Sequence, residues 1–382
     1  MAGLVVLAAC GAPPGSGGFS PRSDGNAAPS PAESPPAAGR TIPNATETPA
    51  PTIPSATQTS TAQPPTPTAP QTSLPPTAAP AAAPAPTASP SPVAALIAQI
   101  DPFKLDDHLR ALVAAGSRDV RHPGHAKAVA YLYEQLRGIP GLEIQTHVGV
   151  YQGMRLENIL AIVDPPVPVA PSGWTLVSAH YDSISNRTPG WDPRTTAAPG
   201  ADDNATGTAA LLEYARILAA NRVQLRNRVV LAFFDGEELF YKGSADFVSK
   251  LTKPYAYKAA INLDMVGFNP IADRLDLLWY LPHSAGLRDR FVVANQRYAI
   301  GVSPLHAQYA ADGNTIMDAA PFGLAGIPSI ALCQRYGEND ASFPGNDTFH
   351  TRNDTEANVT NKRLWLKAAK LTLAVTLELA RE

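Results

Sequence analysis

Two nearly continuous apolar segments in the middle of the chain most restrict its possible fold. Residues 228–234 (RVVLAFF) and 259–263 (AAINL) are short, and they lack the strict alternation of polar and apolar residues that a half-exposed strand shows. Strands of this kind are covered on both faces, which is typical of parallel sheets that lie between layers of helices. We therefore predict a domain built on a buried, mostly parallel sheet.

The segments on either side of these runs alternate between helical and strand patterns. Apolar residues recur at helical spacing in 93–100, 105–115, 126–136, 207–219, 284–298 and 362–380. Strand patterns are present at 144–151, 158–163, 174–179, 275–280 and 329–332. The helix at 207–219 is expected to bury one face against the sheet. This order predicts a doubly wound α/β fold with helices on both faces of the sheet.

The N-terminal part of the chain differs in composition from the rest. Residues 1–10 form a short apolar run that ends at Cys10 and resembles the signal peptide and lipobox of bacterial lipoproteins, although no Lys or Arg precedes the run. Residues 11–92 are rich in Pro, Thr, Ala and Ser with few large apolar side chains, so we expect a disordered linker. The folded domain is then expected at 93–382.

This organisation predicts a protein that lies outside the cytoplasm, either anchored to the membrane by a lipid on Cys10 or secreted. No apolar run approaches the roughly 20 residues of a membrane-spanning helix. The net charge is −3, which gives no indication of nucleic-acid binding. Cys333, the second of the two cysteines, follows an apolar run and is expected to be a buried small residue.

Residues that bind metals follow the predicted strands where each strand ends. Three of these are His180, Glu238 and Asp264. Ligands of open α/β sheets bind outside the carboxyl ends of the strands, so we expect these side chains to lie close together. Asp203, in the segment PGADDNATG, and His350, in FHTRNDT, are two further candidates. Two histidines, two carboxylates and one shared carboxylate are typical of a two-zinc centre, which favours hydrolysis.

Taken together, the motifs resemble those of the M28 family of zinc aminopeptidases. They are His180-Tyr181-Asp182, Pro199 to Asn204, Glu237-Glu238 with Gly243-Ser244, Leu263 to Met265, Pro321-Phe322 with Gly326 to Pro328, and His350-Thr351 with Asp354-Thr355. The resemblance covers the chain from about Leu105 to the C-terminus. It implies a doubly wound α/β/α exopeptidase that uses two zinc ions to remove N-terminal residues from peptides.

The resemblance also implies which residues hold each metal ion. Asp203 would bridge the two zinc ions. His180 and Asp264 would complete the ligands of one ion, and Glu238 and His350 would complete those of the other.

Three further features follow from the resemblance. Glu237 would be the general base that takes a proton from a water molecule between the metals. Asp182 would hold the second ring nitrogen of His180 and fix its orientation. The peptide bond from Asp203 to Asn204 would be cis.

Some positions depart from the family pattern. Phe349 stands where many members have a tyrosine that stabilises the oxyanion, so Tyr336 or Tyr309 is considered as the donor instead. The family's Ser-Asp-His appears here as Met317-Asp318-Ala319, and a usual glycine after the paired glutamates is Phe240. These changes concern substrate specificity more than metal binding.

Two alternatives to an aminopeptidase remain open. One is a related metal-dependent amide hydrolase or glutaminyl cyclase-like enzyme. The other is a non-catalytic binding module of the same fold, which the retention of Glu237 and all five ligand-type residues argues against. The expected substrate is a peptide with a free N-terminus, while the preferred N-terminal residue and the oligomeric state are left unpredicted.

Overall fold

The computed structural model describes residues 91–167, 172–251, 253–303, 305–310, 317–334 and 340–382. All of these residues fall within one unit, Ala83–Glu382. The predicted signal peptide, with Cys10, and almost all of the predicted linker lie outside the described residues, so both stay predictions. Among the described residues, we find no helix with the length and apolar character needed to cross a membrane.

An eight-stranded sheet forms the centre of the domain. Its strands are β1 (Glu143–Tyr151), β2 (Met154–Val163), β3 (Trp174–His180), β4 (Val229–Phe234), β5 (Tyr257–Asp264), β6 (Leu275–Tyr280), β7 (Leu305–Ala310) and β8 (Ser329–Cys333). They are ordered β1-β2-β4-β3-β5-β8-β6-β7. The pairs β3–β4, β3–β5, β5–β8 and β6–β7 are parallel, and the pairs β1–β2, β2–β4 and β6–β8 are antiparallel. The prediction of a mostly parallel sheet is therefore confirmed.

The helices that surround the sheet are α1 (Pro92–Ile97), α2 (Pro102–Val113), α3 (Pro123–Arg137), α4 (Thr206–Ala220), α5 (Lys242–Ser249), α6 (Ala285–Arg297), α7 (Ala320–Leu324) and α8 (Lys362–Arg381). A proline occupies the first turn of α1, α2 and α3, where its missing N–H would have no partner in the helix. Helix α3 consequently begins at Pro123, three residues earlier than the sequence pattern predicts.

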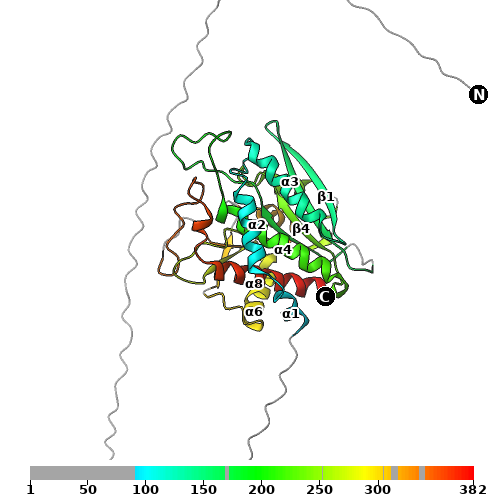
Figure 1. Cartoon of the computed structure of the whole chain (residues 1–382). Coiled ribbons are helices and arrows are strands. Elements are labelled where there is room, and N and C mark those ends of the chain that lie inside the picture. The colour runs from blue at the N-terminus through cyan, green and yellow to red at the C-terminus, as the bar shows by residue number, and fades with distance from the viewer. Residues whose placement is uncertain (1–90, 168–171, 252, 304, 311–316, 335–339) are drawn as a thin grey trace, which may run out of the picture. The chain divides into compact units, whose positions relative to one another are not determined.

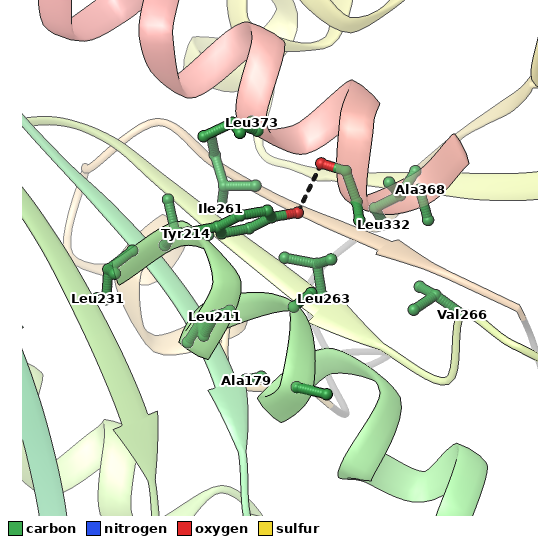
Figure 2. Packing of buried hydrophobic residues seen from close by; sticks show 14 of the residues in the cluster. Ala179, Leu211, Tyr214, Leu231, Ile261, Leu263, Val266, Leu332, Ala368 and Leu373 are labelled. Atoms are coloured by element: carbon green, nitrogen blue, oxygen red, sulfur yellow. Dashed lines mark hydrogen bonds between the residues drawn. The ribbon is translucent and has the colours of Figure 1, made fainter. Parts of the chain in front are cut away.

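The larger core lies between the sheet and a layer that includes α2, α4 and α8. Figure 1 shows these three helices side by side on one face of the sheet. Nearly every residue of α4 is buried, so the helix buries more than the one face that the sequence predicts. The cause is that α2 and α8 also pack against α4. In Figure 2 the Tyr214 hydroxyl of α4 donates a hydrogen bond of 2.7 Å to the backbone oxygen of Ala369 in α8.

A smaller core lies on the opposite face of the sheet, under α5 and α7. Phe234 of β4, Phe247 of α5 and Phe322 of α7 form a triangle with ring centroids 5.8–6.2 Å apart. The two cores together cover both faces of β4 and β5, which are buried along nearly their whole lengths. This arrangement confirms the doubly wound α/β fold.

Candidate metal centre

The five predicted metal ligands meet at the carboxyl ends of β3, β4 and β5. His180 and Asp264 are the last residues of β3 and β5, and Glu238 lies in the loop after β4. Asp203 lies in η1 (Ala201–Ala205), a kinked turn before α4 in which Asp203 itself has non-helical backbone angles, and His350 lies in the loop before η5 (Glu356–Asn358). Parallel strands that end together therefore bring side chains from distant parts of the chain to one place.

Asp203 lies between the two histidines. Its Oδ1 atom is 3.2 Å from His180 Nε2, and its Oδ2 atom is 3.0 Å from His350 Nε2. A second carboxylate accompanies each imidazole, because Asp264 Oδ1 is 3.4 Å from His180 Nε2 and Glu238 Oε2 is 2.8 Å from His350 Nε2. The ligand set thus divides into two groups that share Asp203.

The residues at this place suit a cation. Donor atoms of His180, Asp203 and Glu238 all lie within 4.8 Å of one another. Glu238 Oε1 is buried without a hydrogen-bond partner among the described residues, and His180 Nε2 and Asp264 Oδ1 are buried 3.4 Å apart. Polar atoms buried without a partner are costly to the fold unless something else binds them. Imidazole nitrogen and carboxylate oxygen are both zinc ligands, so the donor set fits zinc.

The backbone around Asp203 is fixed by Asp354. Its carboxylate accepts hydrogen bonds of 3.0 Å from the N–H groups of both Asp202 and Asp203. Gly200, just before this turn, has a φ of 54°, and a Cβ atom there would lie 2.3 Å from the backbone oxygen of Asp203. Only glycine fits this position. The peptide bond between Asp203 and Asn204 is cis, as the family resemblance implied.

Asp182 connects the ends of β3 and β4. Its Oδ1 and Oδ2 atoms accept hydrogen bonds of 3.2 Å from the N–H groups of Glu237 and Glu238, respectively. His180 Nδ1 lies 3.2 Å from the backbone oxygen of Asp182 and 3.4 Å from its Oδ1. Asp182 therefore contacts the ring nitrogen of His180 that faces away from Asp203, and it also positions both glutamates.

Arg118 was not among the predicted site residues, yet it holds together the two ends of the loop between β3 and η1. Its side chain is fully buried, and it donates to the backbone oxygens of Tyr181 at 2.6 Å, Pro199 at 2.5 Å and Gly200 at 2.8 Å. Burial lowers the pKa of Arg118 to about 10, against the opposing effect of nearby carboxylates that include Asp354. No motif distinguishes this arginine in the sequence from an exposed one.

The site concentrates negative charge away from water. Burial raises the pKa values of Glu238, to about 7, and of Asp264. Burial would also raise the pKa of Asp203, but hydrogen bonds with His180 and His350 hold it below its ordinary value. Burial opposes protonation of His350, yet Glu238 and Asp203 raise its pKa to about 11. Bound metal would replace these imidazole protons, because metal ligands bind in their deprotonated forms.

Glu237 is adjacent to the predicted ligand Glu238 but belongs to neither of the two predicted ligand groups. Burial raises the pKa of Glu237 well above its ordinary value, against the opposing effect of His180, and the carboxylates of Asp264 and Asp318 add to the increase. These neighbours place the Glu237 carboxyl group in the same acidic cluster as the predicted metal ligands. A glutamate in such surroundings can accept and release a proton during a reaction.

The positions that depart from the family pattern also lie near the site. Asp318 is fully buried, and burial raises its pKa to about 7 against the opposing effect of His180. Phe349 packs beside His350 with ring centroids 4.5 Å apart. The alternative oxyanion donors are untested, since Tyr336 and the side chain of Tyr309 lie outside the described residues.

Comparison with known sequences shows which protein family this chain belongs to. The sequence profile of peptidase family M28 matches residues 158–376, which is more than half of the 382 residues. The chain belongs to peptidase family M28. The matched M28 region contains the five predicted ligands together with Asp182 and Glu237, whereas Arg118 lies before it.

The sequence identity to individual relatives is low. The chain is 27% identical over 200 residues to a probable leucine aminopeptidase of Trichophyton verrucosum, a match that covers 50% of this chain and 50% of that protein. The chain thus spans about half the length of this curated M28 relative.

Solved structures with the same fold include an aminopeptidase and a cyclase. LapA aminopeptidase of Legionella pneumophila is similar at a TM-score of 0.61 and 18% identity, over 76% of this chain and 74% of LapA. Glutaminyl cyclase of Porphyromonas gingivalis is similar at a TM-score of 0.60 and 22% identity, over 73% of this chain and 99% of the cyclase. At these identities the likeness concerns the fold, which both enzymes share with this M28 chain.

Proposed function

We propose that this chain is a two-zinc aminopeptidase, which removes the N-terminal residue from peptides. The observation that carries the proposal is the position of Asp203, whose two carboxylate oxygens each face a different imidazole. A carboxylate in this position can bridge two ions. In this assignment His180 and Asp264 hold one zinc ion with Asp203, while Glu238 and His350 hold the other.

Two bound zinc ions would polarise the carbonyl of the scissile amide and make a water molecule acidic at neutral pH. Glu237 supplies the base in this proposal. It takes the proton from the attacking water as the carbon–oxygen bond forms, and it gives that proton to the leaving nitrogen as the carbon–nitrogen bond breaks. The hydrogen bond from its own N–H to Asp182 holds the backbone of Glu237 in place for both transfers.

The acidic character of the pocket supports action at a free N-terminus. An α-ammonium group is attracted by buried carboxylates, and Glu237 and Asp264 offer such groups next to the proposed metals. An internal peptide bond brings no positive charge to this pocket. The site is therefore expected to favour the first residue of a peptide over internal positions.

The N-terminal segments suggest where this activity takes place. A lipid on Cys10 and a linker over residues 11–92 would hold the catalytic domain outside the cytoplasm and away from the membrane surface. If the mature protein lacks the lipid, it would be secreted instead. Mass spectrometry of the membrane fraction would show a lipid-modified Cys10, and an unmodified chain recovered only from the medium would contradict anchoring.

The central test uses peptides with free and acetylated N-termini. The zinc-loaded protein should release the first residue from the free peptides only, and cleavage of the acetylated peptides alone would contradict the aminopeptidase assignment. The same assay distinguishes an aminopeptidase from a glutaminyl cyclase. A cyclase would release ammonia from a peptide with N-terminal glutamine without removing a residue. Glu237→Gln should abolish turnover while zinc content stays at the wild-type value. Wild-type turnover in this variant would contradict the role of Glu237 as base.

A further inference from the structure

Arg187 is held against the residues at the His350 side of the metal centre. Its backbone N–H donates to the backbone oxygen of His350 at 2.9 Å. One guanidinium nitrogen donates to the backbone oxygen of Phe349 at 3.1 Å, and the guanidinium carbon lies 4.5 Å above the centre of the Phe349 ring. Two contacts therefore hold this exposed side chain against Phe349, and a backbone hydrogen bond holds its main chain beside a proposed zinc ligand.

Arg187 has no carboxylate partner among the described residues, although other arginines of the domain do. Arg216 pairs with Glu213 at 2.6 Å, and Arg228 pairs with Asp164 at 2.7 Å. Ordering an exposed arginine costs side-chain entropy. A guanidinium that is already ordered, and has no anion of its own, is prepared to bind a carboxylate with two parallel hydrogen bonds.

We propose that Arg187 binds a carboxylate in the leaving part of the peptide substrate. This inference rests on the proposed function and adds a substrate class to it. The buried carboxylates attract the positive N-terminus of the substrate, so the cation beside His350 complements a negative group on the other side of the scissile bond. Short peptides with a free C-terminus carry both charges.

The expected length of the substrate follows from the position of Arg187. Its guanidinium contacts Phe349, and its backbone contacts His350, which is itself a proposed metal ligand. Each residue of a peptide moves the terminal carboxylate by about 3.8 Å at most. Dipeptides and tripeptides therefore keep their carboxylate within one or two residues of the scissile bond, near this side of the site, whereas longer peptides carry it away.

The test compares peptide acids with peptide amides on the zinc-loaded full-length chain. Substrates are leucyl-leucine, trileucine and longer leucine peptides, each as the free acid and as the C-terminal amide. Two amidated dipeptides, leucyl-glutamate amide and leucyl-glutamine amide, show whether a side-chain carboxylate is bound instead of the terminal one. Variants are Arg187→Met, Arg187→Lys and, as a matched control on the same loop, Arg194→Met, which removes another exposed arginine.

The wild type should prefer the free acids of the two shortest peptides over their amides by roughly tenfold in kcat/KM, the size expected of one charge-assisted contact at a partly exposed site. The preference should appear in KM. The ratio of kcat/KM for the acid to kcat/KM for the amide should fall toward one in Arg187→Met, be partly retained in Arg187→Lys, and stay at its wild-type value in Arg194→Met.

Four results distinguish failure of this inference from failure of the proposed function. Equal kcat/KM for leucine acids and amides in the wild type, together with equal kcat/KM for leucyl-glutamate amide and leucyl-glutamine amide, would overturn the role of Arg187, and so would a preference that survives in Arg187→Met. If the wild type prefers leucyl-glutamate amide over leucyl-glutamine amide but does not distinguish the leucine acids from their amides, Arg187 binds the carboxylate of an acidic side chain rather than the C-terminal one. Failure of the wild type to cleave any free peptide would overturn the aminopeptidase proposal itself.

Discussion

Replacement of Arg118 tests how the metal ligands are held in position. In Arg118→Met, three backbone oxygens lose the guanidinium, but Gly200 O keeps a hydrogen bond of 3.1 Å from the N–H group of Ala205. The backbone oxygens of Tyr181 and Pro199 are left without a hydrogen-bond partner among the described residues. These two residues flank the chain segments that carry His180 and Asp203, so both stability and metal binding should suffer.

The expected loss of stability can be worked out from these two oxygens. A buried carbonyl without a partner costs about 1–3 kcal/mol, so the pair costs roughly 2–6 kcal/mol. Methionine also removes the cost of burying a charge, which offsets part of this loss. We therefore expect Arg118→Met to lower the free energy of unfolding by about 2–4 kcal/mol.

Urea unfolding of the metal-free protein measures this change, and a competition titration with a chelating dye measures zinc affinity. Arg118→Lys serves as the comparison, because it keeps the charge but lacks the planar fork that reaches three carbonyl oxygens. It should fall between the wild type and Arg118→Met in both assays. If Arg118→Met unfolds within about 0.5 kcal/mol of the wild type and binds zinc equally well, the positioning role of Arg118 is refuted.

Two further predictions concern stability near the site. Phe240 has a φ of 65° and a side chain that is 77% exposed, and this backbone conformation costs a non-glycine residue about 1–2 kcal/mol. Glycine relieves this strain but loses more chain entropy on folding, so Phe240→Gly should raise the free energy of unfolding by up to about 1 kcal/mol. A lower free energy of unfolding in a urea titration would contradict this. Burial lowers the pKa of His125, but its hydrogen bond with Asp235, at 3.0 Å, contributes to a net increase above the ordinary value. Since the folded-state pKa is the higher one, the stabilisation is complete below the unfolded pKa of about 6.5 and is lost as pH rises through the folded value. The stability difference between wild type and His125→Gln should shrink as pH rises from about 6 through the folded-state pKa of His125, and a constant difference would exclude this linkage.

The sequence predicts best where one local pattern determines the structure. The apolar runs that became β4 and β5 are buried along nearly their whole lengths, because no other arrangement of such residues excludes water. His180 and Asp264 follow from the same pattern, since the end of a parallel strand places the next side chain at the edge of the sheet where ligands bind. The family motifs add Asp203, Glu238 and His350, which no strand pattern positions as clearly.

Features that depend on contacts between distant segments were missed. Helix α5 buries Gly243, Ser244 and only one large apolar residue, Phe247, so its sequence has no clear apolar stripe. Helix α7 has five residues, too few to show a helical period. Strand β7 also went unpredicted. The buried guanidinium of Arg118 binds three backbone oxygens at the two ends of the loop between β3 and η1, and nothing in its neighbouring residues indicates this.

The position of bound metal tests the central claim most directly. Crystals grown with zinc can be measured with X-rays at the zinc absorption edge, where anomalous scattering locates each ion independently of the protein atoms. We predict two anomalous peaks per chain, one contacting His180, Asp203 and Asp264 and the other contacting Asp203, Glu238 and His350. A single peak, or peaks at which Asp203 contacts only one ion, would contradict a two-zinc centre bridged by this carboxylate.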